Sequence, residues 1–334
     1  MSITAKELAK LLGLSASAVS LALNDRPGVS ESTRRRVLDA AKAQGFDFGK
    51  VRPGTKKRGK IAFLRCIRYG AVVKENPFFR DIEDVVAMEC QAHGYTSEVS
   101  SLFLHDDIKK RMDTLLRAGV NGVVLLGTEL REDEFAPFRE TALPVVVMDA
   151  YYENIGLDCV IVNNVQGAYT ATMALLAACR GQPGYLRSSF SISNFEQRAN
   201  GFYMAIRESG LSPSRSVVHR LSPSVEGAYA DMKTVLASGD ELASCYFADN
   251  DLIALGAARA LREAGLRIPQ DVALIGFDNT DLAEQADPPL TSVNFPRLIA
   301  GRLAVQRLLS RIPADTEERV KIEIQTRLVQ RRSV

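Results

Sequence analysis

Short apolar runs alternate with segments of helical periodicity through residues 61–334. The apolar runs predict strands, and they are IAFLR (61–65), GVVLL (122–126), VVVMD (145–149), CVIV (159–162), ASCYF (243–247) and VALIGF (272–277). The segments with helical spacing predict helices over 80–93, 107–118, 164–179, 196–209, 250–264 and 297–310. Strands that alternate with helices form parallel sheets covered by helices, so the pattern predicts an α/β fold for most of the chain. Ligands bind such folds near the carboxyl ends of the strands.

The first residues of the chain carry a different pattern, in which short apolar helical faces are separated by turn residues. Thr4 and Glu7 have the spacing of a capping box that begins a first helix, and Gly13 suits the end of that helix. Ser15 can cap a second helix directly afterwards, and a third helix follows a turn. Three short helices in so few residues predict a compact head that contains a helix-turn-helix.

The second helix has two faces of different chemistry. One face is apolar and is expected to pack inward: Ala18, Val19, Ala22 and Leu23. The other face is small and mostly polar: Ala16, Ser17, Ser20, Leu21 and Asn24. A face of this kind can enter a DNA major groove. An ordinary helical hairpin has the same periodicity, so the helix pattern alone leaves this alternative open.

The distribution of charge favours DNA binding over a plain hairpin. The first 60 residues contain 13 Lys and Arg against 5 Asp and Glu, whereas the rest of the chain contains 29 against 35. The net charge of +2 therefore conceals a basic head on an acidic body. Three basic residues lie near the start of the third helix, which Ser30 can cap: Arg34, Arg35 and Arg36. Clustered basic charge is typical of proteins that bind nucleic-acid phosphates.

Sequence motifs along nearly the whole chain match one known family. The head carries VSLALNDRPGVSESTRRRVLDAAKAQGF. The body carries NPFF (76–79), QRANGF (197–202), DNDLIALGAARALREAGLRIPQDVALIGFDNT (249–280) and PPLTSV (288–293). In these motifs and in their order, the chain resembles the LacI/GalR family of bacterial transcription regulators. The resemblance implies a sequence-specific DNA-binding repressor whose affinity for its operator is controlled by a small-molecule effector.

The resemblance also implies how the chain is divided. We expect a helix-turn-helix DNA-binding domain at 1–48, a basic linker at 49–60, and an effector-binding and dimerisation domain at 61–334. The last domain would be periplasmic-binding-protein-like, with two α/β lobes built on parallel sheets. The expected lobes are 61–161 with 294–320, and 162–293 with the C-terminal strand. Chain crossings near Val162, Val293 and Ile322 would form the hinge.

The DNA contacts expected from the head are of two kinds. Residues that position the protein on phosphates are Thr4, Ser15, Ser20, Asn24 and Arg34. Residues that face base edges are Ala16, Ser17 and Leu21. Ala and Leu can contact thymine methyl groups, and Ser can bond several base edges, but this face offers no Arg for a bidentate bond to guanine. We therefore expect an operator that differs from the family's usual one.

The linker also departs from the family's pattern. Relatives commonly have a hinge helix with a Leu that enters the minor groove, whereas residues 47–60 contain no Leu. Pro53 opposes a helix, as do the glycines around it. Basic residues are frequent, and those expected to contact DNA are Lys56, Lys57 and Arg58. A flexible arm along the phosphates or in the minor groove fits this composition, and a solvated interdomain linker is the alternative.

Strand ends and helix starts provide the expected effector contacts. Asp278 and Asp149 each end an apolar strand, and Asn250 follows another. The resemblance places effector hydrogen bonds at Asp278, Asn250 and Arg198, with the alternatives of capping and turn chemistry for the first two and a surface ion pair for Arg198. Phe78 and Phe79 can stack on an apolar ligand face or can simply belong to the core.

The expected effector is a sugar, with a nucleobase-type corepressor as an alternative. A sugar-binding protein without a transcriptional role would share the body, but it would need a signal peptide and would have no basic head. An enzyme is disfavoured, because the chain has 3 His and contains no H-E-x-x-H, Walker or G-x-S-x-G motif. We expect no cofactor, no metal and no membrane segment. The 5 scattered Cys predict buried thiols in a reducing, cytoplasmic compartment. The resemblance implies a homodimer, and a dimer with two-fold symmetry matches a pseudo-palindromic operator in double-stranded DNA.

Overall fold

The computed structural model describes residues 3–23, 28–44, 46, 58–70, 72–73, 78–103, 105–179, 181–312 and 317–334. The chain divides into two compact units, residues 1–58 and 59–334. The first unit is the head, and the second is the core. Strand β1 of the core begins at Gly59, inside the stretch expected as linker (49–60).

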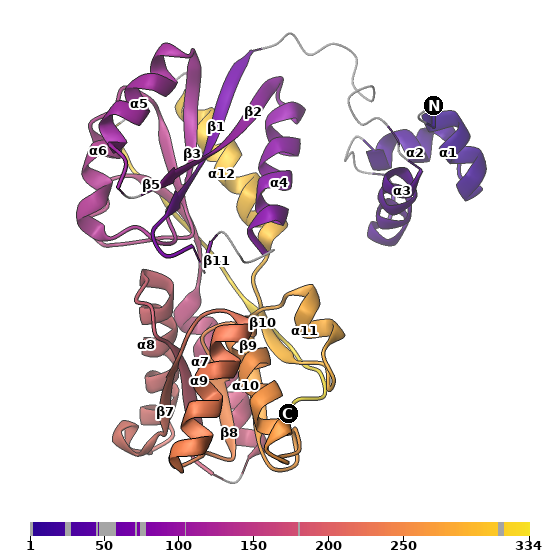
Figure 1. Cartoon of the computed structure of the whole chain (residues 1–334). Helices are drawn as coiled ribbons and strands as arrows, with labels where there is room; N and C mark the ends of the chain where they lie inside the picture. Colours follow the sequence, from indigo (N-terminus) through magenta and orange to yellow (C-terminus); the bar gives the residue numbers. More distant parts are fainter. Residues whose placement is uncertain are drawn as a thin grey trace. The chain divides into compact units, whose positions relative to one another are not determined.

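The head consists of three short helices, which are α1 (Ala5–Leu12), α2 (Ala16–Leu23) and α3 (Glu31–Ala43) (Figure 1). The expected capping box begins α1: the Glu7 backbone N–H donates to Thr4 Oγ1, and the Thr4 N–H donates to the Glu7 carboxylate. Gly13 ends the helix with a φ of 65°, a conformation that favours glycine. The three helices bury a common apolar core: Leu8, Ala9, Val19, Ala22, Val37, Ala41 and Phe46.

The core contains two lobes, and each is built on one sheet. The sheet of lobe 1 has the spatial order β11 (Lys321–Ile324), β5 (Asp158–Val162), β4 (Val145–Met148), β3 (Val120–Leu126), β1 (Gly59–Ile67) and β2 (Tyr95–Phe103). All neighbouring strands in it are parallel. The described helices of this lobe are α4 (Phe78–Ala92), α5 (Ile108–Arg117), the 3-10 turn η2 (Glu132–Phe135), α6 (Ala136–Arg139) and α12 (Arg297–Arg311).

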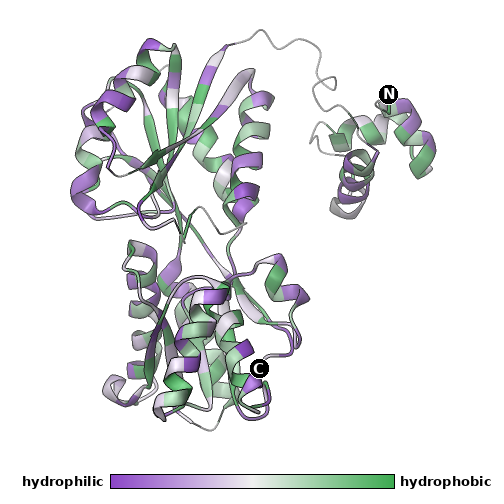
Figure 2. Cartoon of the chain, in the orientation of Figure 1, coloured by the Kyte–Doolittle hydropathy of each residue, from purple (hydrophilic) through white to green (hydrophobic). Residues whose placement is uncertain are grey.

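Alternate residues of the lobe 1 strands enter two separate apolar layers, as the pleat of a strand requires. Ile61 and Phe63 of β1 pack with residues of α4 and α12 on one face. Ala62 and Leu64 of the same strand pack with residues of α5 and α6 on the other. Both faces are covered, so the strands read as continuous apolar runs in the sequence. In Figure 2 the central strands are green, and hydrophilic residues gather on the covering helices.

The second lobe repeats this architecture. Its sheet has the spatial order β12 (Arg327–Val329), β10 (Thr291–Asn294), β9 (Ala273–Asp278), β8 (Cys245–Ala248), β6 (Gly184–Ser188) and β7 (Val218–Leu221). The β12 strand is antiparallel to β10, and the other pairs are parallel. The described helices are α7 (Asn164–Ala178), α8 (Ser193–Glu208), the 3-10 turn η3 (Pro213–Arg215), α9 (Val225–Ser238), α10 (Asp251–Glu263) and α11 (Asp281–Gln285).

The chain crosses between the lobes three times. The crossings follow β5 and β10, as expected, and the third lies between β11 and β12. The third was expected near Ile322 and lies just beyond it. Ile322 still pairs with Val160 inside the lobe 1 sheet, so the expected end of lobe 1 at 320 is too early. The chain therefore crosses after Ile324. None of the helices in the described part of the chain is long and apolar enough to cross a bilayer.

Candidate functional site

A cavity of about 290 Å³ lies between the two lobes. Its walls come from both lobes and combine polar and apolar side chains: Val72, Phe78, Phe79, Thr128, Asp149, Ile192, Asn194, Phe195, Arg198, Asn250, Asp278 and Phe295. All six residues expected to contact the effector are among them. The position agrees with the rule that ligands of parallel sheets bind at the carboxyl ends of strands.

Two aspartates occupy matching places in the two lobes. Asp149 directly follows β4 of lobe 1, and Asp278 ends β9 of lobe 2. Both backbones are left-handed, with φ of 59° for Asp149 and 103° for Asp278. Non-glycine residues seldom adopt this conformation, and it recurs at ligand sites, where the surrounding structure holds it. The same left-handed backbone conformation at the end of a strand thus places each carboxyl group at the cavity.

Arg198, on α8, is buried and held by three groups. Its Nε donates to Asn164 Oδ1 over 2.9 Å, and one terminal nitrogen lies 3.3 Å from Asp278 Oδ1. The other terminal nitrogen donates to the backbone carbonyl of Asp249. The guanidinium also lies 3.7 Å from the centre of the Phe277 ring. Arg198 is therefore a fixed donor in a buried ion pair, which differs from the alternative of a surface ion pair.

Asn250 has both of the roles considered for it in the sequence. Its Oδ1 accepts a hydrogen bond of 2.9 Å from the Ile253 backbone N–H, so it caps α10. The residue also lines the cavity. Capping engages the carbonyl oxygen of the side chain, and the amide nitrogen is a donor of the kind that a polar ligand can use.

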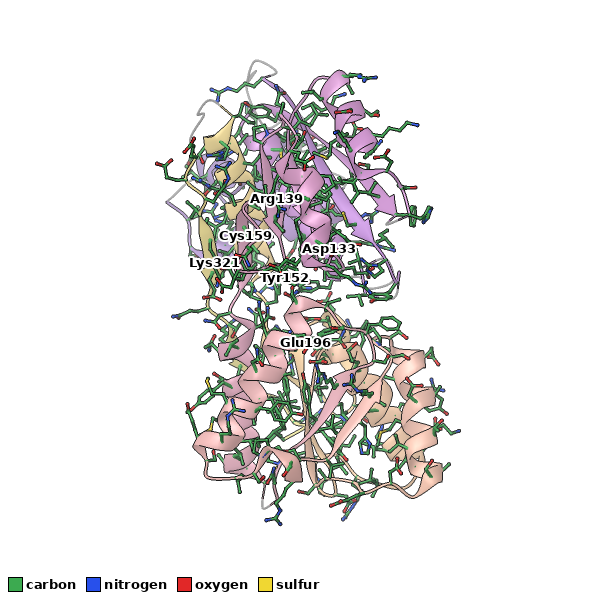
Figure 3. The ribbon with its side chains drawn as sticks, turned by 90° about the vertical axis from the view of Figure 1, so that its left-hand side faces the viewer. Asp133, Arg139, Tyr152, Cys159, Glu196 and Lys321 are labelled. Carbon is green, nitrogen blue, oxygen red and sulfur yellow. The ribbon has the colours of Figure 1, made fainter. Side chains whose placement is uncertain are left out.

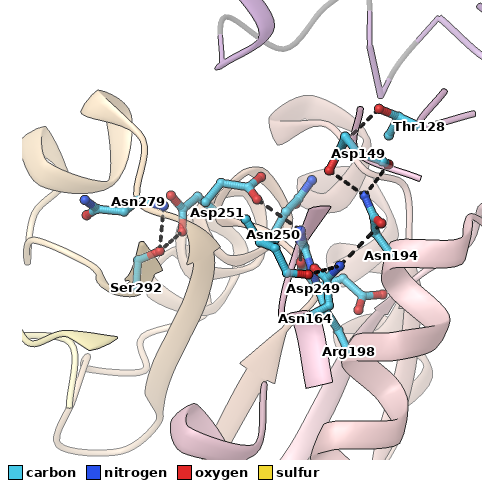
Figure 4. A network of polar contacts seen from close by, with 12 residues as sticks. Thr128, Asp149, Asn164, Asn194, Arg198, Asp249, Asn250, Asp251, Asn279 and Ser292 are labelled. Carbon is cyan, nitrogen blue, oxygen red and sulfur yellow. Dashed lines mark hydrogen bonds and ion pairs between the residues drawn. The ribbon is translucent and has the colours of Figure 1, made fainter. Parts of the chain in front are cut away.

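A hydrogen-bond network joins the lobes at Asp149 (Figure 4). Thr128 Oγ1 of lobe 1 donates to one carboxylate oxygen over 2.6 Å. Asn194 Nδ2 of lobe 2 donates to the other over 2.8 Å. Asn194 in turn accepts from Asn164, which holds Arg198. One network therefore crosses the lobe boundary and runs from Thr128 through Asp149, Asn194 and Asn164 to Arg198.

Burial controls the protonation of the acids around the cavity. Loss of water raises the pKa of Asp149 and of Asp278 to about 6, and Arg198 partly offsets this rise in both. Burial also raises the pKa of Asp249 to about 6. For Asp251, burial and repulsion from Asp278 raise the pKa to about 7. Several acids share a buried region with few cations, so the site is rich in hydrogen-bond acceptors.

Phe78 and Phe79 begin α4, and both line the cavity. The Phe78 ring meets Phe79 edge-on at 5.1 Å between centres and Phe295 at 4.8 Å. All three rings also belong to the buried core of lobe 1. Phe78 and Phe79 therefore belong to the core and also face the cavity.

Another aromatic residue, Tyr152, lies at the border of lobe 1. Its hydroxyl donates to the Leu130 carbonyl (Figure 3).

Six lining residues were not anticipated from the sequence. Thr128 comes two residues after β3, so the rule of strand ends that selected Asp149 could have found it. Asn194 lies in the first turn of α8 and carried no comparable signal. The other four are apolar residues, and nothing in the local sequence separates them from ordinary core positions: Val72, Ile192, Phe195 and Phe295.

The head presents the expected faces of α2. Val19 and Ala22 are buried, Ala16, Ser17 and Ser20 are exposed, and Leu21 is half-buried. Ser15 caps this helix, since its Oγ accepts from the Ala18 N–H over 3.1 Å.

The other expected DNA contacts are spread over the head and linker. Thr4 and Arg58 are exposed, and Arg34 is half-buried. Asn24, Lys56 and Lys57 lie outside the described residues. The DNA contacts of all these residues stay predictions.

Comparison with known proteins identifies the chain. The profile of the family described as "Periplasmic binding proteins and sugar binding domain of LacI family" matches residues 68–332. The HTH-type transcriptional repressor PurR of Mannheimia succiniciproducens is 31% identical, over 99% of this chain and 98% of that protein.

Two solved structures have the same fold. The transcriptional regulator CelR in its cellobiose complex is 25% identical, with a TM-score of 0.73 over 99% of this chain and 100% of that one. The lac repressor dimer, bound to operator and the anti-inducer ONPF, is 20% identical, with a TM-score of 0.71 over 100% and 99%. The relatives matched in sequence are repressors rather than enzymes. The chain belongs to the LacI/GalR family, and it is a ligand-responsive transcriptional repressor.

Proposed function

We propose that this repressor binds a small uncharged sugar in the cavity between its lobes. The observation that carries the proposal is the fixed set of Arg198 within α8, Asp278 at the end of β9 and Asn250 at the start of α10. A carboxylate, a guanidinium and an amide offer acceptors and donors in fixed geometry, as neighbouring sugar hydroxyls require. The phenylalanine rings on the lobe 1 side supply a surface for the apolar face of a sugar ring.

Size and charge narrow the class of ligand. The cavity is small in this structure, which favours a compact ligand over an extended one. The two lining carboxyl groups, Asp149 and Asp278, face one lining guanidinium, that of Arg198, which already pairs with Asp278. This balance disfavours phosphorylated or carboxylated ligands. The CelR relative, which is bound to cellobiose, supports a sugar as the class.

A nucleobase is the second candidate, and the aromatic content of the cavity favours it. Four of the lining residues are phenylalanines: Phe78, Phe79, Phe195 and Phe295. Aromatic rings pack well on a flat heterocycle, whose ring N–H groups could donate to Asp278. A nucleobase would use the same polar side chains as a sugar, but it would make more extensive contact with the phenylalanine rings.

Thermal unfolding with a ligand panel tests both candidates. A ligand that binds the folded state raises the unfolding temperature, and the rise grows with the logarithm of its concentration once that concentration exceeds its Kd. We expect D-ribose, D-glucose or another monosaccharide to raise it, whereas glucose 6-phosphate leaves it unchanged. Adenine and guanine test the alternative. Asp278→Asn should abolish the shift, and Asp113→Asn, an exposed change on α5, should preserve it. A shift with the sugar phosphate alone would contradict the proposal.

The proposed regulation is linkage between effector and DNA. Repressors of this family act as dimers on operator DNA, and here each protomer would place one α2 helix in the major groove of a half-site. An effector that favours one lobe angle changes DNA affinity, and DNA changes effector affinity by the same factor. Sequencing of genomic fragments captured by the purified protein tests this. Strong peaks with a shared inverted repeat are expected, and uniform capture without a motif would contradict it.

A further inference from the structure

The turn after β1 is held in place by one buried carboxylate. This turn comprises residues 68–70 and 72–73, and we refer to it as the clasp turn. Glu129 Oε2 accepts from the backbone N–H groups of Arg68 and Tyr69, over 2.5 and 2.7 Å. Glu129 Oε1 accepts from the Val73 N–H over 3.0 Å. Glu129 is only 1% exposed, so these bonds form away from water, where hydrogen bonds to a charged group are strong.

The side chain of Arg68 also holds the clasp turn in place. Its Nε donates to the Glu129 backbone carbonyl over 3.3 Å, and its guanidinium pairs with the carboxylate of Glu134. Both glutamates follow β3 in lobe 1. The clasp turn is therefore fixed to its own lobe by polar bonds to its backbone and to Arg68, which leaves its other side chains to make contacts elsewhere.

Those other side chains reach lobe 2. The Tyr69 ring stacks on Phe190, with 4.5 Å between centres and 22° between planes. Val72 packs in a buried cluster with Ile192 and Phe195. The three lobe 2 residues lie between β6 and the first turn of α8, distant in sequence from every chain crossing. The contact is an apolar bridge between the lobes, made by side chains alone.

The bridge is also a wall of the effector cavity. Val72, Ile192 and Phe195 all line that cavity. When the lobes separate, this wall must divide, since Val72 belongs to one lobe and the other two to the second. The apolar area of the bridge therefore favours closed lobes, and closed lobes hinder the exit of a ligand.

We propose that Glu129 is a positioning residue that presents the clasp turn to lobe 2, and that the Tyr69–Phe190 and Val72–Ile192–Phe195 contacts govern ligand retention by holding the lobes closed. The retention part rests on the proposed effector site. The closure part does not, because the bridge consists of contacts between the two lobes themselves. A protein whose binding-competent state is less populated binds its ligand more weakly by the same factor.

A tryptophan reporter tests the closure part without any effector. The chain contains no Trp, so Phe190→Trp places a single indole against Tyr69. In this background we expect Glu129→Gln, and separately Tyr69→Ala, to shift the emission to the red and to increase quenching by acrylamide. Glu132→Gln, an exposed change three residues later at the start of η2, should do neither. Tyr69→Ala removes no buried polar group, so it keeps the test valid if Glu129→Gln folds poorly.

Hydrogen exchange tests the positioning role directly. In Glu129→Gln the amides of Arg68, Tyr69 and Val73 should exchange faster by about tenfold or more, because the charged acceptor that they share is removed. The amides of β3 should keep their protection. Unchanged exchange in the clasp turn, or emission that is the same in all variants, would overturn the proposal, even if thermal stability falls.

Measurement of ligand release distinguishes a failure of this proposal from a failure of the proposed function. With D-ribose or whichever panel compound shifts the wild-type unfolding temperature, Tyr69→Ala should release the ligand faster, by about tenfold. Asp278→Asn should prevent binding and leave the reporter emission of the unliganded protein unchanged. If no panel compound binds but the emission shifts occur, the proposed ligand class is wrong and the role of the clasp turn in lobe closure is supported. If release is equally fast in both proteins, the retention role fails and the ligand site stands.

Discussion

Asn194 in lobe 2 donates its side-chain amide to the carboxylate of Asp149 in lobe 1, over 2.8 Å. The same nitrogen lies 3.0 Å from the Asp149 backbone carbonyl. One side chain therefore recognises both the backbone and the carboxylate of a residue whose φ is 59°. This bond crosses the lobe boundary at the edge of the cavity, so its strength contributes to lobe closure.

A double-mutant cycle on this pair should show coupling. We expect Asp149→Ala and Asn194→Ala together to destabilise the core by less than the sum of the single changes, with a coupling of about 1–2 kcal/mol in urea unfolding. The exposed Asn154 provides the control, and Asp149→Ala with Asn154→Ala should be additive within about 0.5 kcal/mol. Additivity for Asn194 as well would show that the bond contributes nothing to stability.

Loss of Arg198 should be severe. Arg198→Ala removes the partner of buried Asp278, the donor to the Asp249 carbonyl and the contact with the Phe277 ring. Breaking a buried pair on one side costs about 3–5 kcal/mol. Arg207→Ala, an exposed change on the same helix, should stay within about 0.5 kcal/mol of the wild type. Equal unfolding midpoints for the two variants would contradict the buried role.

Stability should fall as the pH rises from about 4 to about 7. In the folded chain the pKa of Asp149, Asp249 and Asp278 is about 6 and that of Asp251 about 7, against an ordinary 3.8. Between these values the folded state holds protons that the unfolded state releases, so the free energy of unfolding decreases with pH. Urea unfolding at several pH values measures the slope. Asp251→Asn should make it shallower, and a slope of opposite sign in this window would refute the assignment.

The basic linker should contribute to the salt dependence of DNA binding. Replacing Lys56, Lys57 and Arg58 with Gln should make the slope of log K against log salt shallower, by about 0.9 for each phosphate that the variant no longer neutralises. The exposed Lys109 of the core is the control, and Lys109→Gln should leave the slope unchanged. An unchanged slope in the triple variant would identify the segment as a solvated linker.

Dimerisation should depend on apolar side chains that the core leaves in solvent. Met88 of α4 is 57% exposed and Leu282 of α11 is 45% exposed. Both helices lie at the right of the core in Figure 1. We expect Met88→Glu with Leu282→Glu to give a monomer in sedimentation and to weaken operator binding strongly, since both half-sites need a head. Leu116→Glu on α5, where the leucine is 44% exposed, should preserve the dimer. A dimer in both variants would place the interface elsewhere.

The parts of the fold that could be predicted from the sequence are those with a local cause. Strands such as Val145–Met148 are buried on both faces, so they stand out as apolar runs. The edge strand Tyr95–Phe103 has mostly half-exposed or exposed residues, and its apolar pattern is too weak to detect. The end of lobe 1 was expected too early, at 320, because Lys321–Ile324 looks the same in sequence whichever sheet it joins, and its partner Asp158–Val162 is far away in the chain.

The residues of the site likewise divide into those with a local signal in the sequence and those without one. Asp278, Asn250 and Asp149 follow from the rule that strand ends face a ligand. Asn194 could not be found in this way, because its role depends on a partner in the other lobe. Glu129 gave no signal at all, since an acid after a strand is ordinary until three backbone amides converge on it.

The three crossings between the lobes have a mechanical consequence. A single tether would let the lobes swivel and slide, whereas three short connections that lie beside one another restrict them to rotation about one axis, since β5 neighbours β11 and β10 neighbours β12. The separation of the lobes is then described by a single angle. Ligands of different chemistry can then differ only in whether they open or close this angle, and by how much. The same core can therefore serve induction or corepression without a change of architecture.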